Sequence, residues 1–238
     1  LQNLEDRFKN HPAVVIGAGP SLDQNAEALK NAAPGVLLIA VDTALHPLLQ
    51  RGIQPHIVVA VDPMQLNFKH FQKVDCLEPA LFAYLPECHY QILEKYPDHQ
   101  KLVCLHDLES KTLRSWAPMA GFQKCFQRGM NVGYCAFSLA RKLGCSPLVL
   151  VGMDLALGAT GSTHASETAN NSQTVYHPET QTVDLKGNIE ETARRVLSVE
   201  GYDGSPVLTY PSFHQYRLHF EEDIAQMDTP VINATEGG

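Results

Sequence analysis

A glycine turn near the start of the chain has the residue types that bind phosphate groups. The segment Val14 to Leu29 reads VVIGAGPSLDQNAEAL, so an apolar run breaks at glycines and restarts as a helix. Glycines let the backbone approach a phosphate, and the first turn of the next helix offers free N–H groups and a positive dipole end. The candidate ligands of a nucleotide phosphate are Gly17, Gly19, Pro20 and Ser21.

The same turn also has an interpretation that needs no ligand. Leu22 stands where the dinucleotide fingerprint G-x-G-x-x-G has its third glycine, so the motif is incomplete. Ser21 and Gln24 have the spacing of a capping box, in which side chains satisfy the first N–H groups of a helix. Pro20 suits a helix start in either case. Both interpretations stay open.

Three further apolar runs end in an aspartate. Asp42 follows IAV, Asp62 follows VAV and Asp154 follows VGM. Because the carboxyl ends of parallel strands meet at one edge of a sheet, we expect these carboxylates beside the glycine turn. Asp42, some twenty residues past the glycines, has the position that commonly bonds a ribose hydroxyl. The other two could bond ribose or base, hold Mg²⁺, or only cap the turn that follows.

A second glycine turn precedes another helix. The segment 129–133 reads GMNVG and leads into a helical stretch that feeds the strand ending at Asp154. Asn131 could cap this helix or donate to a nucleotide, and Gly133 would allow a phosphate to approach. We therefore expect phosphates near both turns.

A doubly wound sheet would position these residues. Short runs rich in Val, Ile and Leu alternate with helical stretches, which is typical of a mostly parallel, Rossmann-like α/β fold. The expected strands are 13–17, 35–42, 56–63, 80–86, 101–107, 147–154 and 230–234. The expected helices are 21–32, 44–52, 89–96, 131–144 and 213–227.

The alternation stops between residues 155 and 210. The first part is polar and loop-like, and the stretch 196–210 indicates two strands around an Asp203-Gly204 turn. We interpret this region as an insertion that covers the ligand edge. Its His164 is a candidate general base, because an imidazole titrates near neutral pH. The alternative is a solvated histidine without a role.

Bulk properties limit the partners. The 238 residues suffice for one α/β domain, and the formal net charge of −8 argues against a nucleic-acid partner. No apolar run reaches the length of a membrane span. The six cysteines are scattered without a C-x-x-C pair, as in a reduced cytoplasmic protein. Because the chain starts at Leu1, we expect a single domain taken from a longer protein.

Taken in order, several of these motifs resemble one family. The segments IGAGPSL, the two AVD runs, GMNVGYCAFSLARKLGC, VLVGMDLA, THA, VEGYDGSPVLT and INATEGG are similar to the central domain of motility accessory factors. That wider family includes archaeal 6-hydroxymethylpterin pyrophosphokinases. Bacterial sialyltransferases are more distantly similar, through a G-x-G-P-S-L turn and a strand ending in G-x-D. The resemblance covers nearly the whole chain.

The resemblance implies a glycosyltransferase. Motility accessory factors transfer nonulosonic acids from CMP donors to Ser or Thr of flagellin, so a CMP-sugar would be the substrate and flagellin the partner. The sialyltransferases have asparagines near the positions of Asp42 and Asp62, and the aspartates here make a bound cation such as Mg²⁺ more plausible. Their base and phosphate-binding tyrosines fall in a variable segment, where this chain offers the candidates His164, Tyr176, His177 and Tyr216.

Two other functions stay open. In the pyrophosphokinase alternative the same turns hold ATP, and the strand-end aspartates carry Mg²⁺ while a pterin hydroxymethyl group attacks. In the other alternative the domain only binds a nucleotide, as a non-catalytic module. No cofactor other than Mg²⁺ is indicated by the sequence.

Overall fold

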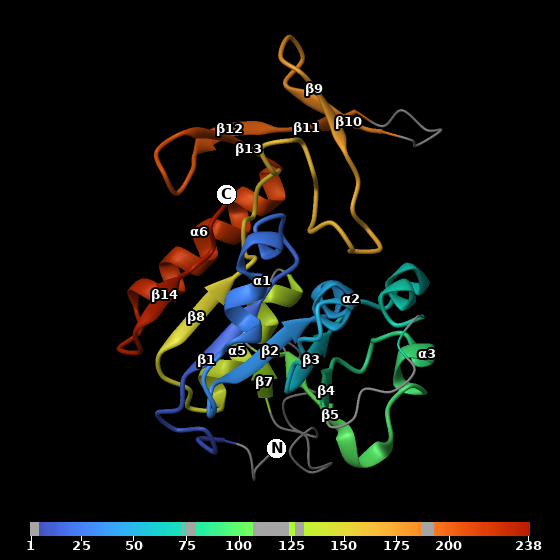
Figure 1. Cartoon of the computed structure of the whole chain (residues 1–238), viewed down its shortest axis with the longest axis vertical. Coiled ribbons are helices and arrows are strands. Elements are labelled where there is room, and N and C mark those ends of the chain that lie inside the picture. Colours follow the sequence, from blue (N-terminus) through green and yellow to red (C-terminus); the bar gives the residue numbers. More distant parts are fainter. Residues whose placement is uncertain (1–4, 73, 75–79, 107–123, 127–130, 187–192) are drawn as a thin grey trace, which may run out of the picture.

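A seven-stranded parallel sheet forms the centre of the molecule (Figure 1). The computed structural model describes residues 5–72, 74, 80–106, 124–126, 131–186 and 193–238. The strand order is β14-β8-β1-β2-β3-β4-β5, and every pairing is parallel. The strands are β1 (Ala13–Ile16), β2 (Leu37–Val41), β3 (Ile57–Ala60), β4 (Leu81–Tyr84), β5 (Lys101–Val103), β8 (Leu148–Val151) and β14 (Val231–Asn233). All seven lie within the predicted runs, which confirms the doubly wound α/β fold.

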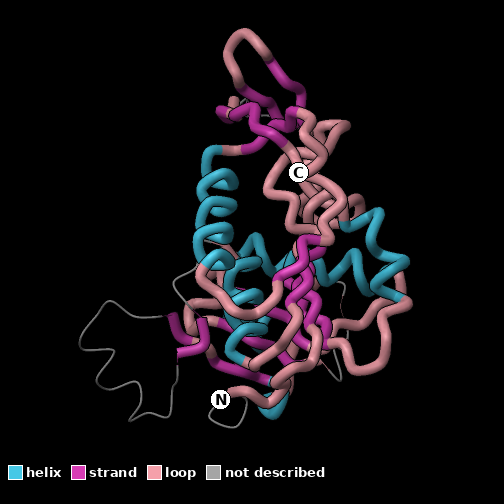
Figure 2. Tube along the Cα trace, turned by 90° about the vertical axis from the view of Figure 1, so that its left-hand side faces the viewer, coloured by secondary structure: helices cyan, strands magenta, loops and turns pink. Residues whose placement is uncertain are grey.

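Helices cover both faces of this sheet (Figure 2). They are α1 (Leu22–Lys30), α2 (Asp42–Gln50), α3 (Tyr90–Leu93), α5 (Val132–Lys142), α6 (Pro211–Ala225) and the 3-10 helices η1 (Gln65–His70) and η2 (Asp98–Gln100). Each of the five predicted helices is present, although α3 is only one turn long. Neither η1 nor η2 was predicted from the sequence. None of the helices in the described part of the chain is long and apolar enough to cross a membrane.

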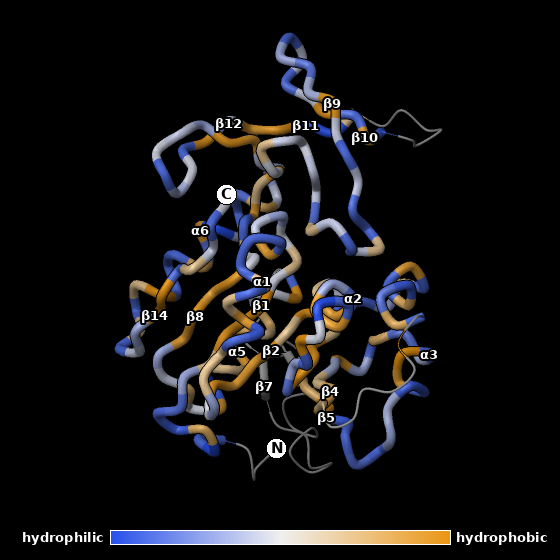
Figure 3. Tube along the Cα trace, in the orientation of Figure 1, coloured by the Kyte–Doolittle hydropathy of each residue, from blue (hydrophilic) through white to orange (hydrophobic). Residues whose placement is uncertain are grey.

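The core explains why the strand runs are apolar throughout. Every residue of β1, β2 and β3 is buried, since helices pack on both faces. Helix α5 crosses β1, β2 and β3 and meets α6 through the rings of Tyr134, Phe137 and Phe220. Figure 3 shows the apolar residues concentrated along the strands of the main sheet. The four cysteines with described side chains, Cys88, Cys104, Cys135 and Cys145, are all buried.

The order of the strands creates a topological switch point at β1. From β1 the chain proceeds to β2 and onward on one side, whereas β8 and β14 are added on the other side. In open α/β sheets, ligands bind in the crevice outside the carboxyl ends of the strands at this point. The glycine turn after β1 and Asp154 after β8 both lie there.

The described residues between 155 and 210 include two small antiparallel sheets beyond the carboxyl edge of the main sheet (Figure 1). They contain β9 (Thr174–His177), β10 (Thr182–Leu185) and β11 (Arg194–Arg195), and the hairpin β12 (Leu197–Glu200) and β13 (Pro206–Thr209). The hairpin confirms the predicted pair of strands. The three-stranded sheet was not predicted, because it buries little beyond Leu157, Val183 and Val196 and so lacks an apolar pattern.

A further difference concerns the run 101–107, which was expected to be one strand. It divides into β5 and β6 (Leu105–His106), and β6 pairs with β7 (Lys124–Phe126) in a separate parallel sheet. The division places only the first half of the run in the main sheet.

Candidate functional site

The two glycines of the first turn pack against the end of strand β8. A Cβ atom on Gly17 would overlap the carbonyl oxygen of Gly152, and one on Gly19 would overlap the carboxylate of Asp154. Because the strand ends approach so closely, both positions admit only a hydrogen atom as side chain. We expected these glycines to make room for a phosphate. In the structure they also make room for β8 and its aspartate.

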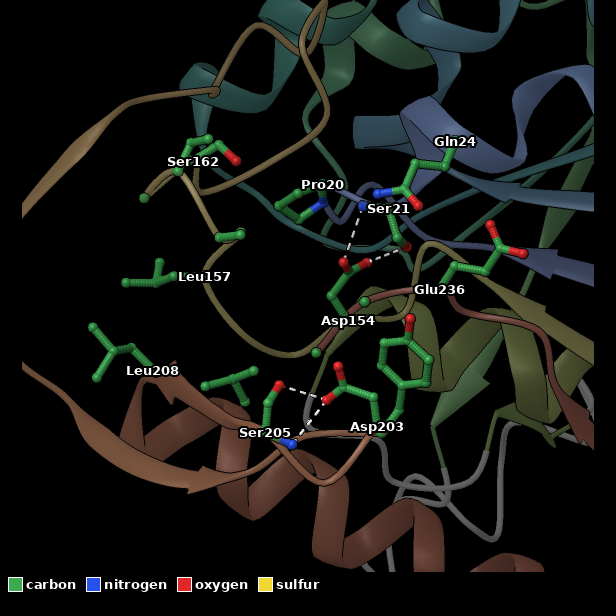
Figure 4. Close-up of a pocket in the computed structure, with 18 of the residues that line it drawn as sticks. Pro20, Ser21, Gln24, Asp154, Leu157, Ser162, Asp203, Ser205, Leu208 and Glu236 are labelled. Atoms are coloured by element: carbon green, nitrogen blue, oxygen red, sulfur yellow. Dashed lines mark hydrogen bonds between the residues drawn. The ribbon is translucent and has the colours of Figure 1, made fainter.

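Ser21 binds Asp154 directly (Figure 4). Its N–H donates to Asp154 Oδ1 at 3.0 Å and its hydroxyl donates to Oδ2 at 2.8 Å. Although Ser21 is the N-cap of α1, its side chain makes no capping hydrogen bond, so the predicted capping box is wrong. The hydroxyl is committed to the aspartate instead. Burial raises the pKa of Asp154, and the two bonds from Ser21 oppose this rise.

The start of α1 therefore already holds an anion. The N–H groups of Gly17 and Gly19 donate to carbonyl oxygens of β8 and its following turn at 2.8 Å each. A phosphate at Ser21 would have to displace the carboxylate of Asp154, because both would use the same donors. Phosphate binding by Gly17, Gly19, Pro20 and Ser21 stays a prediction, and the structure adds this competition to it.

The second predicted turn has N–H donors that are not used inside helix α5. The side-chain oxygen of Asn131 accepts the N–H of Tyr134 at 2.8 Å and thereby caps α5, as one of the two interpretations predicted. The N–H groups of Val132 and Gly133 have no partner inside the helix. A Cβ on Gly133 would lie 2.8 Å from Met153 Sδ, so this glycine also permits close packing. The preceding residues of the turn, 129–130, lie outside the described part of the chain.

Asp42 and Asp62 come together at the ends of β2 and β3. Asp42 is the first residue of α2 and is 1% exposed, with Oδ1 accepting the N–H of Thr43 at 2.7 Å. Its Oδ2 is buried and finds no partner among the described residues. Burial, together with the charge of Asp62, raises the pKa of Asp42 to about 7. Asp62 lies nearer the surface and accepts a hydrogen bond from Asn67 at 2.9 Å.

The loop that carries His164 rests on the glycine turn. The N–H of Ala165, which is fully buried, donates to the carbonyl oxygen of Ala18 at 3.0 Å. His164 Nδ1 lies 3.0 Å from the hydroxyl of Thr163, and burial lowers the pKa of the imidazole. His164 is therefore beside the predicted phosphate turn and is biased toward the neutral form that can accept a proton.

Two more histidines face this loop, and the sequence analysis missed both. His70, in η1, is fully buried and accepts a hydrogen bond from Asn170 at 3.2 Å. Burial, followed by the charges of His164, Lys69 and His46, lowers its pKa to about 4. His46 of α2 donates to the carbonyl oxygen of Glu167 at 2.9 Å. No motif or spacing connects these histidines in the sequence, so only the fold reveals them.

We use the name neutral flank for Asp42, His70 and His164, because burial shifts the pKa of each toward the uncharged form. Asp42 and His46 are one helical turn apart on α2, which places them on the same face of that helix. Within the described residues, no group of three His, Cys, Asp or Glu side chains is arranged to hold a metal ion.

A cavity of about 840 Å³ lies on the other side of the glycine turn (Figure 4). Ser21 and Asp154 border it, as do Tyr176, Asp203 and Glu236. We call it the acidic cavity. Of the candidates chosen only by region, Tyr176 therefore faces a cavity. His177 is bonded to Asp184 at 2.8 Å on the exposed side of β9, and Tyr216 of α6 does not border the acidic cavity.

Comparisons with known proteins agree with this architecture. A family model described as "6-hydroxymethylpterin diphosphokinase MptE-like" matches residues 1–160, two thirds of the chain. A similar solved structure is the MAf glycosyltransferase from Magnetospirillum magneticum AMB-1, with a TM-score of 0.64 and 18% identity. The match covers 97% of this chain and 34% of that protein, so the chain spans about a third of its length. No curated protein sequence matches the chain.

Proposed function

The chain belongs to the MptE-like family, and we propose that it transfers a sugar from a nucleotide donor to a hydroxyl acceptor. In finer terms, the donor is a CMP-linked nonulosonic acid and the acceptor is a Ser or Thr of flagellin. Support comes from the ordered motifs and from the likeness in fold to the MAf glycosyltransferase along almost the whole chain.

The observation that carries this proposal is the neutral flank beside the glycine turn. A CMP-sugar reaction needs donors for the leaving phosphate and a base for the acceptor hydroxyl, with water kept away. The N–H groups at the start of α5, which have no partner inside the helix, the Oδ2 of Asp42, which has none among the described residues, and the imidazole of His164 supply groups of these kinds.

Each residue has one step in the proposal. The N–H groups of Val132 and Gly133 stabilise the phosphate as its bond to the sugar breaks. Asp42 binds a ribose hydroxyl through Oδ2, as acids at the end of a second strand commonly do. His164 removes the proton of the acceptor hydroxyl while that oxygen attacks the anomeric carbon. Burial of the imidazole favours its neutral, proton-accepting form.

Isothermal titration calorimetry with CMP, CTP and ATP, each with and without Mg²⁺, tests the donor. We expect cytidine nucleotides to bind more tightly than ATP and chelation of Mg²⁺ to change the affinity little. Asp42→Asn should weaken binding of CMP more than it weakens binding of inorganic phosphate, since the ribose contact is lost. Tight binding of ATP that depends on Mg²⁺ would contradict the proposal.

A pyrophosphokinase is the second candidate, favoured by the description of the family model and by the pair Asp42 and Asp62. Mg²⁺ is usually held by one or two carboxylates and by the phosphates of the substrate. These two aspartates fit that donor set, and Mg²⁺ would neutralise charge on the transferred group. Formation of AMP from ATP with a hydroxymethylpterin, in a mass-spectrometric assay, would favour this function over the transferase.

A further inference from the structure

The acidic cavity is a second ligand site that the donor does not fill. It opens at the switch point between β1 and β8, where ligands bind in sheets of this kind. Its walls come from the start of α1, the loop 157–162, strand β9, the hairpin β12–β13 and the segment 236–238. With about 840 Å³, it has room for several amino-acid residues.

The charges around this cavity have one sign. Asp23, Asp154, Asp203 and Glu236 border it, and the described residues that line it include no Lys, Arg or His. Asp23 is paired with Arg51 at 2.7 Å and Asp154 is bonded to Ser21, so the exposed carboxylates of Asp203 and Glu236 set the potential. A phosphate, or the carboxylate of a nonulosonic acid, would be repelled here. The donor of the proposed reaction therefore belongs on the other side of the turn.

Aromatic side chains add a preference for cations. Tyr176 is 38% exposed and Tyr202 is 64% exposed, and both border the cavity. An ammonium or guanidinium group is attracted to the face of a tyrosine ring as well as to carboxylates. Asp203 is held in place by the N–H of Ser205 at 2.9 Å and by its hydroxyl, as Figure 4 shows. Those bonds lower the pKa of Asp203, so it is ionised at neutral pH.

The loop between the two sides links the cavity to the proposed base. Ser162 borders the acidic cavity, and His164 follows two residues later on the neutral flank. The cavity and the proposed base are therefore joined by one short segment of this loop.

We propose that the acidic cavity binds the acceptor as a peptide segment that carries Ser or Thr together with Lys or Arg. This inference rests on the proposed function and adds a specificity to it: Asp203 and Glu236 select basic acceptor segments and reject acidic ones. Tyr176 and Tyr202 pack against the basic side chains, and Asp154 forms the base of the cavity next to Ser21.

The experiment measures binding of three fluorescent octapeptides to the full chain by anisotropy. Each contains one Thr, and the other positions carry two Lys, two Asp or two Gln. We expect the Lys peptide to bind at least about tenfold more tightly than the Asp peptide, and its affinity to fall as salt is raised. A ratio near one, or tighter binding of the Asp peptide, would overturn the proposal.

Matched variants test the residues. Asp203→Asn with Glu236→Gln should weaken the Lys peptide about fivefold to tenfold and leave the Gln peptide unchanged. The Asn side chain still accepts the Ser205 N–H, so the turn is preserved. The control pair Asp228→Asn with Glu222→Gln makes the same charge change on residues outside the cavity. Equal loss in both pairs would mean that only net charge matters and would overturn the site.

Two further readouts separate this inference from the proposed function. A neutral trisaccharide that competes with the Lys peptide at similar concentration would assign the cavity to carbohydrate and overturn the peptide. Binding of CMP, measured on the same samples, should be unchanged by the double variant. If CMP fails to bind while the Lys peptide binds as expected, the transferase proposal fails and the peptide site stands.

Discussion

The two sides of the glycine turn treat their ionisable groups in opposite ways. On the neutral flank, burial raises the pKa of Asp42 to about 7 and lowers the pKa of His70 to about 4. In the acidic cavity, Asp203 is exposed and hydrogen bonds lower its pKa. Both sides carry carboxylates, so it is burial that decides which of them keeps its charge.

The difference indicates that the two sides have separate roles. A histidine accepts a proton only in its neutral form, whereas attraction of a basic partner needs charges that face solvent. Asp154 lies between the two sides, because burial raises its pKa while Ser21 stabilises its ionised form. Four changes test this comparison, from the largest expected effect to the smallest.

His164→Ala should have the largest effect, because it removes the proposed base from the neutral flank. We expect kcat for sugar transfer to fall by about a hundredfold or more, the usual size of a general-base loss. Affinity for CMP should stay within about twofold, since His164 makes no contact with the nucleotide in the proposal. Steady-state kinetics with a CMP-sugar donor, together with calorimetry, gives both values.

The matched control is His177→Ala, which changes an exposed histidine bonded to Asp184 on β9. This variant should transfer sugar at the normal rate. Normal transfer by His164→Ala would remove the catalytic role of the neutral flank and would leave only its structural one.

Asp42→Asn should change how stability depends on pH. The pKa of Asp42 is about 7 in the folded protein and 3.8 when unperturbed. The free energy of unfolding therefore falls as pH rises from about 4 to about 7. The three-unit shift corresponds to at most about 4 kcal/mol. The asparagine does not titrate, so its desolvation adds the same amount at every pH, and we expect the variant to gain about 2 kcal/mol, half of this upper bound, over the parent between pH 4 and pH 8.

Urea unfolding at a series of pH values measures this difference. Below about pH 3 the carboxyl is protonated in both states, so parent and variant should differ by a constant amount there. Curves that stay parallel up to pH 8 would mean that Asp42 is charged in the folded protein, and the neutral flank would lose one of its members.

Gly19→Ala tests the contact between the glycine turn and Asp154, which lies between the two sides. The added Cβ would overlap the Asp154 carboxylate, and we expect a loss of about 1–2 kcal/mol in the free energy of unfolding. In an Asp154→Ala background the cost should fall by half or more, because the two closest atoms, Oδ2 and Cγ, are gone and only Cβ at 2.9 Å remains. A double-mutant cycle by urea unfolding gives this coupling.

Gly35→Ala is the matched control for the cycle. Gly35 has φ of +91°, and a Cβ added there would meet no atom of the described residues within 4 Å, so its cost is backbone strain alone. That cost should be the same in both backgrounds. Equal coupling for both glycines would show that Asp154 is not what excludes a side chain at Gly19.

Arg51→Met should have the smallest effect. Arg51 joins Asp23 at 2.7 Å and Glu167 at 3.0 Å, and so ties the His164 loop to α1 and α2. Partly exposed ion pairs contribute little, and we expect less than about 1 kcal/mol of global stability to be lost. Hydrogen exchange at Ala165 should quicken about threefold to fivefold, because the loop opens more often.

Lys101→Met is the control. It breaks an ion pair between Lys101 and Asp98, and both residues are far from the His164 loop in the sequence. It should leave exchange in the His164 loop unchanged. Unchanged exchange in Arg51→Met would show that the loop is held by Ala165 and Ala18 rather than by the ion pairs.

The main sheet was predictable from sequence because its strands are buried on both faces. Such strands appear as continuous apolar runs, and each of the seven runs contains a strand of the sheet. The sheet of β9, β10 and β11 could not be recognised in this way. Its strands bury one apolar side chain fully, Val183, and otherwise mostly face solvent.

The site was predictable only in part. Strand-end aspartates and both turns were expected at one edge, and the fold brings Ser21, Asp42 and Asp154 to it. The direct bond from Ser21 to Asp154 was not predicted. The rule about strand ends says which residues share one edge of the sheet, but it does not say which of their atoms form a hydrogen bond. His46 and His70 were missed, since their meeting with His164 depends on how one loop is placed.

The bond between Ser21 and Asp154 also has a consequence for how the protein is made. It joins residues 133 positions apart, and the paired strands β1 and β8 are separated by a similar length of chain. Until β8 has left the ribosome, β1 can pair only with β2, and its other edge offers unpaired N–H and C=O groups to any strand nearby. The site therefore assembles late in synthesis, and a ribosome that stalls before residue 148 releases a chain with an open apolar edge.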